Sequence, residues 1–322
     1  MEKRPEFWNN SKRYYDLKSY WRNRFGCKVY KLPIDAGFTC PNRDGKVAWG
    51  GCIYCDGRGS QLRQAGPLPS VTDQVNKGKA YYTVHRQAGK FIAYFQTFTN
   101  TYGNPADLKR LYDEALAQPD VIGLSVGTRP DCVPEETIRI MEDYARDFHI
   151  WLEFGLQSIH DRTLQRINRG HDARTFLDAV SRVAGRGILL CVHIIVGLPG
   201  ENQDDILETA RVLAGLPIQG IKIHSLLALR GTALGDRYEK GEIALIDREE
   251  YVKIVCDILE ILPPETVIQR LTADGYKDIF LGPAWAVNKM AVLNGIDWEL
   301  KRRQSWQGMR FPMRPGTPSP SN

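Results

Sequence analysis

The sequence predicts an α/β fold in which parallel strands form a barrel or a partial barrel. Short apolar runs of strand length alternate with amphipathic runs of helix length, a pattern typical of βαβ units. The run at 189–196 is almost continuously apolar, as expected of a strand buried on both faces. The length of 322 residues corresponds to about two average domains or to one barrel. The regular alternation favours the single barrel.

The expected strands are the short apolar runs, which lie in chain order at 29–34, 91–96, 121–126, 150–155, 189–196, 220–226 and 266–271. The expected helices are the amphipathic stretches between and after them, at 71–88, 106–117, 135–147, 173–184, 204–214 and 248–262. Two of these helices begin with start signals: Pro105 precedes one, and Pro134 is followed by acidic residues in the first turn of the next.

The chain divides into four expected regions. A basic and aromatic segment occupies 1–28, a barrel core 29–245, and a helical extension 246–309. The proline-rich tail at 310–322 is expected to be disordered.

Composition and charge indicate a globular protein without a membrane segment. Hydrophobic residues make up 43% and charged residues 25% of the chain, which are ordinary values for a soluble protein. The net charge of +5 permits a phosphate-rich partner but does not require one. No apolar stretch follows Met1, and the longest apolar run is about half the length that spans a bilayer. We therefore expect a cytoplasmic protein with reduced thiols and no membrane partner.

Three of the seven cysteines form a cluster in a glycine-rich stretch after the first expected strand. Cys52 and Cys55 have the C-x₂-C spacing that places two thiolates on one tight turn, and Cys40 adds a third from upstream. Three thiolates match three corners of a [4Fe–4S] cluster and leave one iron open. Glycine allows the backbone to wrap closely around such a group.

Zinc is an equally good interpretation of this spacing alone. Structural zinc usually takes four ligands from two paired arms, and only one arm is present, although Cys27 is a candidate for the fourth ligand. Unliganded thiols are the third alternative. Cys191 and Cys256 lie in apolar contexts and are expected to pack in the core, and Cys132 is expected to be structural.

An ordered series of motifs resembles the radical SAM superfamily. The cysteine spacing Cys40-x₁₁-Cys52-Ile53-Tyr54-Cys55 departs from the common C-x₃-C-x₂-C but is similar to that of elongator-catalytic-subunit-like members, particularly the bacterial YhcC/YtqA type. Further matching motifs fall on successive strand–helix units, at 127–131, 152–158, 168–171, 193–201, 229–232 and 283–285. The resemblance runs from about Tyr14 to Gln307.

The resemblance implies a partial (β/α)6 TIM-like radical SAM barrel with a C-terminal helical extension. Chemistry in parallel α/β barrels lies at the carboxyl ends of the strands, where these motifs fall. It further implies that Cys40, Cys52 and Cys55 bind a [4Fe–4S] cluster whose fourth iron is chelated by S-adenosylmethionine (SAM). The implied reaction is cleavage of SAM to a 5′-deoxyadenosyl radical, in an enzyme whose class, oxidoreductase or transferase, stays open.

The resemblance also implies SAM-binding residues. Gln96 and Thr97 occupy the place of the motif that meets the SAM amino group, although the usual glycines are missing. Gln157, Arg169 and His193 match positions that contact the ribose or the carboxylate.

The resemblance also concerns residues on the third and fourth expected strands and in the cysteine loop. Gly127 falls where many relatives have a SAM-contacting glutamate, so either Glu153 substitutes for it or the contact is absent. A carboxylate in mid-strand must be paired, because an unpaired buried charge is costly. Tyr54 is expected beside the adenine, and His224 is expected, like Gln96, in the substrate pocket. No catalytic acid or base can be named.

The resemblance to elongator-like proteins implies tRNA as a partner, modified at the wobble uridine, and an electron donor such as flavodoxin or ferredoxin. Two basic regions are candidates for binding its phosphates and stacking its bases: residues 12–24, which contain interleaved aromatics, and residues 301–303. Equally, these can be solvated faces with aromatic stems in the core. The alternatives are a radical SAM enzyme acting on a small metabolite or a protein, and a non-catalytic zinc-stabilised nucleic-acid-binding protein.

Overall fold

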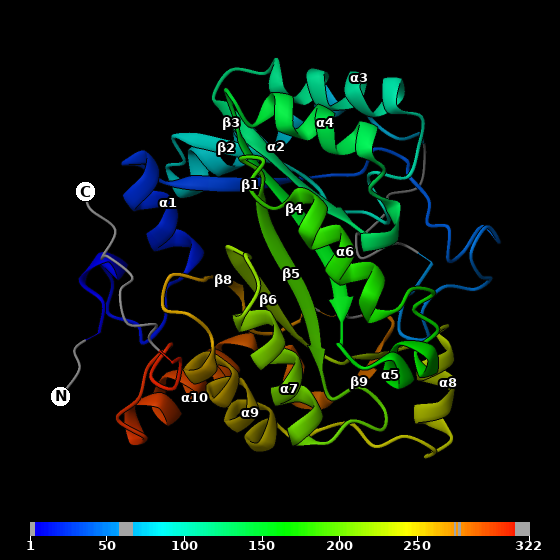
Figure 1. The fold of residues 1–322 in the computed structure, drawn as a ribbon, viewed down its shortest axis with the longest axis vertical. Coiled ribbons are helices and arrows are strands. Elements are labelled where there is room, and N and C mark those ends of the chain that lie inside the picture. Colours follow the sequence, from blue (N-terminus) through cyan, green and yellow to red (C-terminus); the bar gives the residue numbers. More distant parts are fainter. Residues whose placement is uncertain (1–3, 58–66, 274, 276–277, 313–322) are drawn as a thin grey trace.

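A curled sheet of seven parallel strands forms the centre of the computed structural model, which describes residues 4–57, 67–273, 275 and 278–312 (Figure 1). The strand order is β1-β2-β3-β4-β5-β6-β8, so each strand pairs with the next strand of this sheet along the chain. The strands are β1 (Val29–Ile34), β2 (Lys90–Phe95), β3 (Val121–Thr128), β4 (His149–Gln157), β5 (Leu189–Val196), β6 (Gly220–Ser225) and β8 (Val267–Arg270). The predicted partial barrel is confirmed, and it has one parallel strand more than the six predicted for the core.

Helices cover the outer face of the sheet, as Figure 1 shows. The α-helices of the described residues, including those outside this layer, are α1 (Leu17–Phe25), α2 (Val71–Arg86), α3 (Pro105–Leu116), α4 (Glu135–Tyr144), α5 (Asp161–Arg166), α6 (Ala173–Val183), α7 (Gln203–Ala214), α8 (Ala233–Glu239), α9 (Arg248–Ile261) and α10 (Lys289–Arg302). Every strand and helix expected from the sequence is present, with bounds that differ by a few residues. The short antiparallel pair β7 (Ala228–Leu229) and β9 (Phe280–Gly282) was not predicted.

Amphipathic spacing explains how each helix packs on the sheet. In α6 the residues Phe176, Ala179, Val180 and Val183 are buried, and this i, i+3, i+4, i+7 spacing places them on one face. The side chain of Asp172 caps the helix by accepting a hydrogen bond from the Thr175 N–H. α6 packs against β4. In the neighbouring strand β5, all but two of the eight residues are buried, as its near-continuous apolar sequence predicts.

The N-terminal segment closes the open side of the half-barrel. Helix α1 contacts both β1 and β8, the first and last strands of the sheet. The Ile268 N–H of β8 donates to the Tyr15 carbonyl at 2.8 Å. Tyr15 and Trp21 are 7% and 6% exposed and pack in hydrophobic clusters at this seam. Tyr15 and Trp21 are therefore core residues rather than free stacking surfaces, while Lys18, Arg22 and Arg24 remain exposed.

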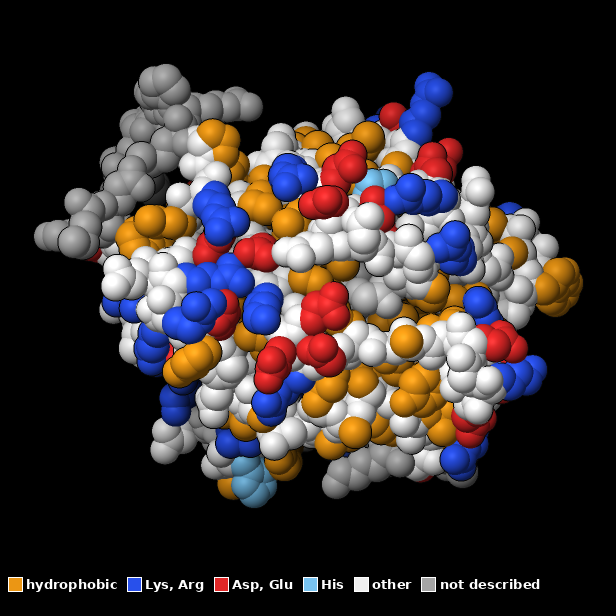
Figure 2. Space-filling view, turned by 90° about the horizontal axis from the view of Figure 1, so that it is seen from below, with side chains coloured by type: hydrophobic (Ala, Val, Ile, Leu, Met, Phe, Trp, Pro, Cys, Tyr) orange, Lys and Arg blue, Asp and Glu red, His pale blue; other side chains and the backbone are white. Residues whose placement is uncertain are grey.

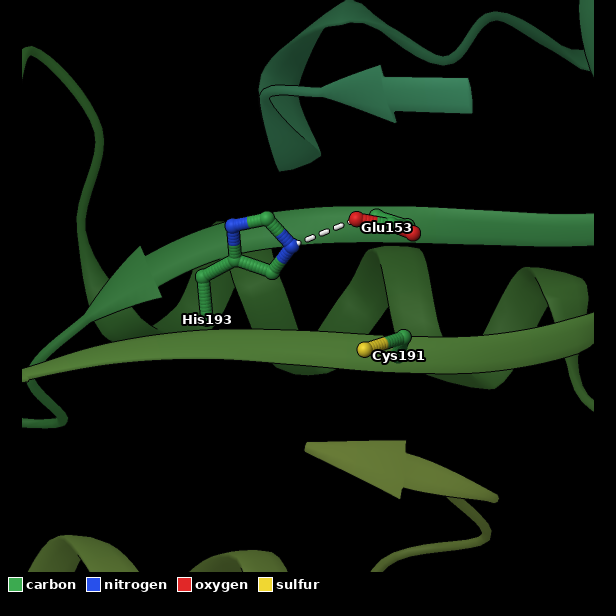
Figure 3. A group of neighbouring side chains, drawn as sticks. All are labelled: Glu153, Cys191 and His193. Carbon is green, nitrogen blue, oxygen red and sulfur yellow. Dashed lines mark hydrogen bonds and ion pairs between the residues drawn. The ribbon is translucent and has the colours of Figure 1, made fainter. Parts of the chain in front are cut away.

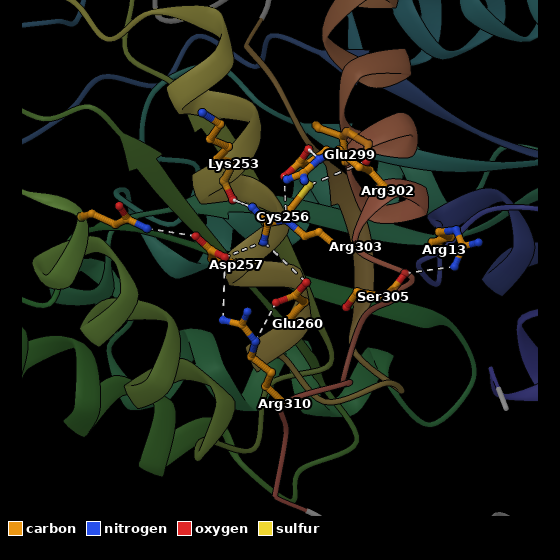
Figure 4. A network of polar contacts seen from close by, with 12 residues as sticks. Arg13, Lys253, Cys256, Asp257, Glu260, Glu299, Arg302, Arg303, Ser305 and Arg310 are labelled. Carbon is orange, nitrogen blue, oxygen red and sulfur yellow. Dashed lines mark hydrogen bonds and ion pairs between the residues drawn. The ribbon is translucent and has the colours of Figure 1, made fainter. Parts of the chain in front are cut away.

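The C-terminal region is joined to the barrel by strand β8, which pairs with β6, and by the packing of α9 against α7 and α10. A polar network links α9 and α10 (Figure 4). Arg303 lies at its centre: its guanidinium contacts Glu299 at 2.7 Å, Asp257 at 2.6 Å and Glu260 at 3.5 Å. Hydrogen bonds from Arg302 and Arg303 lower the pKa of Glu299 to about 2.

The basic cluster at 301–303 is therefore neutralised within the fold, which argues against its interpretation as a phosphate-binding patch. Lys301 pairs with Asp297 at 2.6 Å, and Arg302 pairs with Glu299 at 2.8 Å. Figure 2, which views the molecule from below, shows Lys and Arg side chains interspersed with Asp and Glu side chains on the face in view. Arg310, at the start of the predicted tail, also pairs with Glu260 at 2.8 Å. The tail from residue 313 onward lies outside the described residues.

None of the helices in the described ranges is both long enough and apolar enough to cross a bilayer.

Replacing Arg303 with Met is expected to lower the free energy of unfolding by about 3 kcal/mol, because three largely buried carboxylates lose their shared cation. Replacing Lys301 with Met removes an ion pair whose lysine is 58% exposed, and it should change stability by less than about 1 kcal/mol. Urea denaturation of both variants measures the difference. Equal effects would show that the network does not hold the two helices together.

Candidate functional site

The loop that follows β1 brings the three clustered cysteines to one cavity. Cys40, Cys52 and Cys55 all line a cavity of about 680 Å³ at the carboxyl ends of the strands. The Cys55 N–H donates to the Cys52 carbonyl at 2.9 Å, which closes the tight turn expected of C-x₂-C. Gly50 and Gly51 have φ values of +81° and +83°, a backbone conformation that glycine adopts without strain.

The segment after α5 holds this loop in place. Asn42 donates from its side-chain amide to the Asn168 carbonyl at 2.6 Å, and Asn168 donates to the Gly51 carbonyl at 2.8 Å. Gly170, with φ of +75°, lies so close that an added Cβ would be 2.3 Å from the Asn42 Oδ1. The motif at 168–171 therefore acts as a clamp on the cysteine loop.

Arg169 connects this clamp to a cysteine. Its side chain is buried, and it donates to the Gly155 carbonyl at 3.1 Å and to the Cys52 Sγ at 3.6 Å. Arg129 in turn donates to the Arg169 carbonyl at 2.7 Å and forms an ion pair with Asp131 at 2.8 Å. The fit is close, because a Cβ on Gly155 would lie 2.8 Å from the Arg169 Nη2.

The chemistry of this donor set fits an iron–sulfur cluster. Burial, and then the neighbouring Cys52, raise the pKa of the Cys55 thiol to about 12. Three adjacent thiolates therefore need a bound cation to exist together. Burial alone lowers the pKa of Arg169, but Cys52 and Tyr54 reverse this and raise it, so the guanidinium stays charged beside the Cys52 sulfur. Asn42 adds a second N–H toward this sulfur at 3.6 Å.

Glu153 lies at the centre of a buried polar network deeper in the barrel, which we call the floor network: Glu153, Lys31, Lys222, Tyr94, His193, Ser125 and Gln269. The Glu153 carboxylate is fully buried. One of its oxygens accepts from Lys31 at 2.5 Å and from Ser125. The other accepts from Tyr94 at 3.1 Å, from His193 at 2.7 Å and from Lys222. The requirement that this mid-strand carboxylate be paired is thus met.

The floor network determines the protonation of its members. Burial raises the pKa of Glu153, but the ammonium groups of Lys222 and Lys31 outweigh this and hold it well below its usual range. Burial, and then Lys222, lower the pKa of His193 to about 4. His193 is therefore neutral near pH 7, and its Nε2–H is the donor to the carboxylate.

Glu153, Cys191 and His193 lie close enough together to suggest a metal site (Figure 3). Two ammonium groups already bind the same carboxylate and would repel a cation placed there. Burial also raises the pKa of Cys191, which keeps the thiol protonated. This trio therefore does not fit a metal ion, and Cys191 packs in the core against Trp151, as predicted.

The other sequence-predicted site residues lie around the same cavity, with one exception. Gln96, Gln157, His193, His224 and Tyr54 all line it. Thr97 is fully buried and is not part of the lining. Gln157 has a φ of +80° at a register shift between β4 and β5, a strained conformation for a residue with a side chain. Contact of these residues with SAM stays a prediction.

The remaining cysteines lie away from the loop or within the core. Cys27 precedes β1 and packs near Gly89, at the opposite end of the strand from Cys40. It is therefore not a fourth ligand, which removes the basis of the zinc interpretation with four cysteines. Cys132 and Cys256 are buried, as predicted.

Sequence reasoning missed Lys31, Tyr94, Lys222 and Arg270, which line or support the cavity. A signal was present for the two lysines. Each stands in the middle of an apolar strand, VYKLPI and GIKIHS, where a charge requires a buried partner.

Replacing Glu153 with Gln is expected to lower the free energy of unfolding by about 3–5 kcal/mol, because two buried ammonium groups lose their only counter-ion within the network. Lys222→Met should be tolerated better, since Lys31 still neutralises Glu153. Thermal and urea denaturation of the two variants measures which of them is less stable. A Glu153→Gln protein as stable as Lys222→Met would contradict this account of the network.

Two family models and a relative from Bacillus subtilis match this chain over most of its length, and a further relative matches about half of it. The model of the Radical SAM superfamily matches residues 40–213, and that of the Radical_SAM C-terminal domain matches residues 218–302. YtqA of Bacillus subtilis (strain 168) is 43% identical over 94% of this chain and 94% of its own. A tRNA uridine(34) acetyltransferase of Dehalococcoides mccartyi is 26% identical over 49% of this chain and 34% of its own.

A solved structure shows the same fold. The archaeal Methanocaldococcus infernus Elp3 with an N-terminal deletion superposes with a TM-score of 0.66 at 16% identity, over 87% of this chain and 64% of that one. The matched models, the high identity to YtqA and the position of the cysteine loop agree. The chain belongs to the radical SAM superfamily and is an enzyme that uses a [4Fe–4S] cluster and S-adenosylmethionine.

Proposed function

We propose that this radical SAM enzyme modifies the wobble uridine of tRNA, with Cys40, Cys52 and Cys55 as the ligands of its cluster. The observation that carries the ligand assignment is the meeting of these three thiols in one cavity, beside two N–H donors directed at the Cys52 sulfur. When bound, the cluster and SAM supply one-electron cleavage of SAM and a 5′-deoxyadenosyl radical. This chain's residues position the substrate and exclude water.

Arg169 has the clearest role in this proposal. Its guanidinium donates to the Cys52 sulfur while its side chain is anchored on the Gly155 carbonyl. A charge-assisted hydrogen bond of this kind stabilises the thiolate form of a ligand. Arg169 is also expected to contact SAM together with Gln157 and His193, which line the same cavity.

The remaining SAM contacts in the proposal have unequal access to the cavity. Gln96 lines the cavity, and its side-chain carbonyl would accept from the SAM amino group, whereas Thr97 would contribute through its backbone. Tyr54 packs beside a hydrophobic cluster and offers an apolar face to the adenine. Glu153 has both oxygens occupied within the floor network, so it would act on SAM through His193.

Support for a tRNA substrate comes from the relatives and from one exposed side chain. A protein named for action on tRNA uridine 34 shares part of the sequence. In this chain, Trp49 is 76% exposed in the cysteine loop, two residues before the cavity-lining Gly51. Exposed aromatic rings next to a binding cavity are typical platforms for stacking an unpaired base. The proposal places the enzyme in the cytoplasm, with flavodoxin or ferredoxin as electron donor.

Anaerobically reconstituted protein is expected to contain about four irons and four sulfides per chain and, with a reductant, to produce 5′-deoxyadenosine from SAM. Cys52→Ala should lose the cluster and this product, because one of three thiolate ligands is gone. The matched control is Cys27→Ala, which removes a thiol at the other end of β1. Zinc without iron in the wild-type protein would overturn the proposal in favour of the zinc-stabilised alternative.

A strain that lacks the gene is expected to show an altered wobble-uridine profile when its tRNA nucleosides are analysed by mass spectrometry. Expression of the wild-type protein should restore the profile, and Trp49→Ala should restore it poorly, since loss of one stacking contact weakens RNA binding by about tenfold or more. Trp298 is 63% exposed on α10, so Trp298→Ala is the control. An unchanged profile in the deletion strain would instead favour a small-molecule or protein substrate.

A further inference from the structure

The floor network carries more positive charge than its own groups require. Within the network, two ammonium groups, Lys31 and Lys222, face the single carboxylate of Glu153. His193 lies beside them as a neutral ring, because burial and Lys222 lower its pKa to about 4. The pKa of His224 is likewise held well below its usual value, mainly by burial and then by Arg270. One positive charge in this part of the barrel therefore has no counter-ion among the network's members.

Lys31 and Lys222 differ in how many of their ammonium N–H groups have a hydrogen-bond acceptor. Lys31 uses all three of its N–H groups, donating to Ser125 at 2.9 Å, Glu153 at 2.5 Å and Gln269 at 2.7 Å. It does not line the cavity. Lys222 lines the cavity and donates to Tyr94 at 2.8 Å and to Glu153. An ammonium has three N–H groups, so Lys222 has one without an acceptor among the residues that the structure describes.

A second cationic side chain lies beside Lys222 in the sheet. Arg270 pairs in register with Lys222 and lines the same cavity. Burial, and then the Arg270 guanidinium, lower the pKa of His224. Positive charge is therefore concentrated at this part of the lining.

The depth of Lys222 restricts what can reach it. Lys222 and His224 are two residues apart in β6, so their side chains lie on the same face of the strand. Lys222 therefore lies about 6–7 Å further into the barrel than His224. Its lateral neighbours in the sheet are His193 on β5 and Arg270 on β8. A backbone phosphodiester continues in both directions along its strand, so a terminal group of the substrate is better suited to reach this depth.

We propose that Lys222, with Arg270 beside it, forms a subsite for a terminal oxyanion of the substrate, either a carboxylate or a phosphate monoester. The oxyanion supplies the missing counter-ion and accepts the unused N–H of Lys222. This inference rests on the proposed function in so far as the cavity is the substrate chamber, and it names the chemistry of the group that lies deepest in it. A substrate base already bearing an acidic substituent satisfies the subsite.

Binding of small anions to the cluster-loaded protein tests the subsite without any reductant or RNA. Sodium acetate and inorganic phosphate are titrated separately at constant ionic strength, and the rise in melting temperature gives each apparent Kd. Saturable binding of acetate indicates that the subsite takes a terminal carboxylate of the substrate. Saturable binding of phosphate indicates that it takes a terminal phosphate monoester. Because no SAM is cleaved in this assay, its result is independent of whether the proposed tRNA activity holds.

Three variants make the test specific. Lys222→Met should weaken binding of the effective anion by about tenfold or more, since it removes a charge-assisted hydrogen bond. Lys222→Arg should retain most of the affinity, and Lys79→Met, which removes a lysine whose side chain is 18% exposed on α2, should leave it unchanged. Should Lys222→Met fail to fold, Lys222→Gln, which removes the charge but keeps an N–H donor, is expected to weaken binding severalfold. Wild-type protein that binds neither anion, or a Lys222→Met or Lys222→Gln protein that binds as well as wild type, would overturn the proposal.

Discussion

The parallel direction of the seven strands is the constraint on which the site depends. Because every strand of this sheet has its carboxyl end at the same edge, groups that are far apart in the sequence meet at one cavity. The cysteine loop after β1, Gln96 after β2, Gln157 at the end of β4 and Ser225 at the end of β6 all line it. The same constraint places Cys27 at the opposite end of β1 and so excludes it from the donor set.

A second requirement follows from closing apolar strands around charged groups. Lys31, Glu153 and Lys222 stand in the interior of the barrel, where an unpaired charge is costly. Their mutual contacts satisfy Lys31 and Glu153 completely but not Lys222. The unused N–H and the positive charge of Lys222 favour binding of an anionic group in the cavity.

The two ends of the chain complete the barrel rather than extend it. Tyr15 and Trp21 pack at the seam beside β1 and β8, and Arg303 joins α9 to α10 through buried carboxylates. Tyr15 and Trp21 of the N-terminal segment and the basic residues at 301–303 are thus used for packing and pairing. The exposed aromatic residue at the cavity is Trp49, in the cysteine loop itself, and the proposed RNA contact lies there.

The sequence by itself determined the alternation of strands and helices, because hydrophobic period and length are local properties that survive in any tertiary arrangement. It also determined the cysteine loop, since spacing and glycine content are read directly from neighbouring residues. Only the tertiary structure decided that Lys222 faces the cavity while Lys31 does not, that Arg169 reaches the Cys52 sulfur, and that 301–303 is neutralised. These outcomes depend on contacts between residues tens or hundreds of positions apart, and the free energy of a buried charge is set by such partners rather than by its neighbours in the chain.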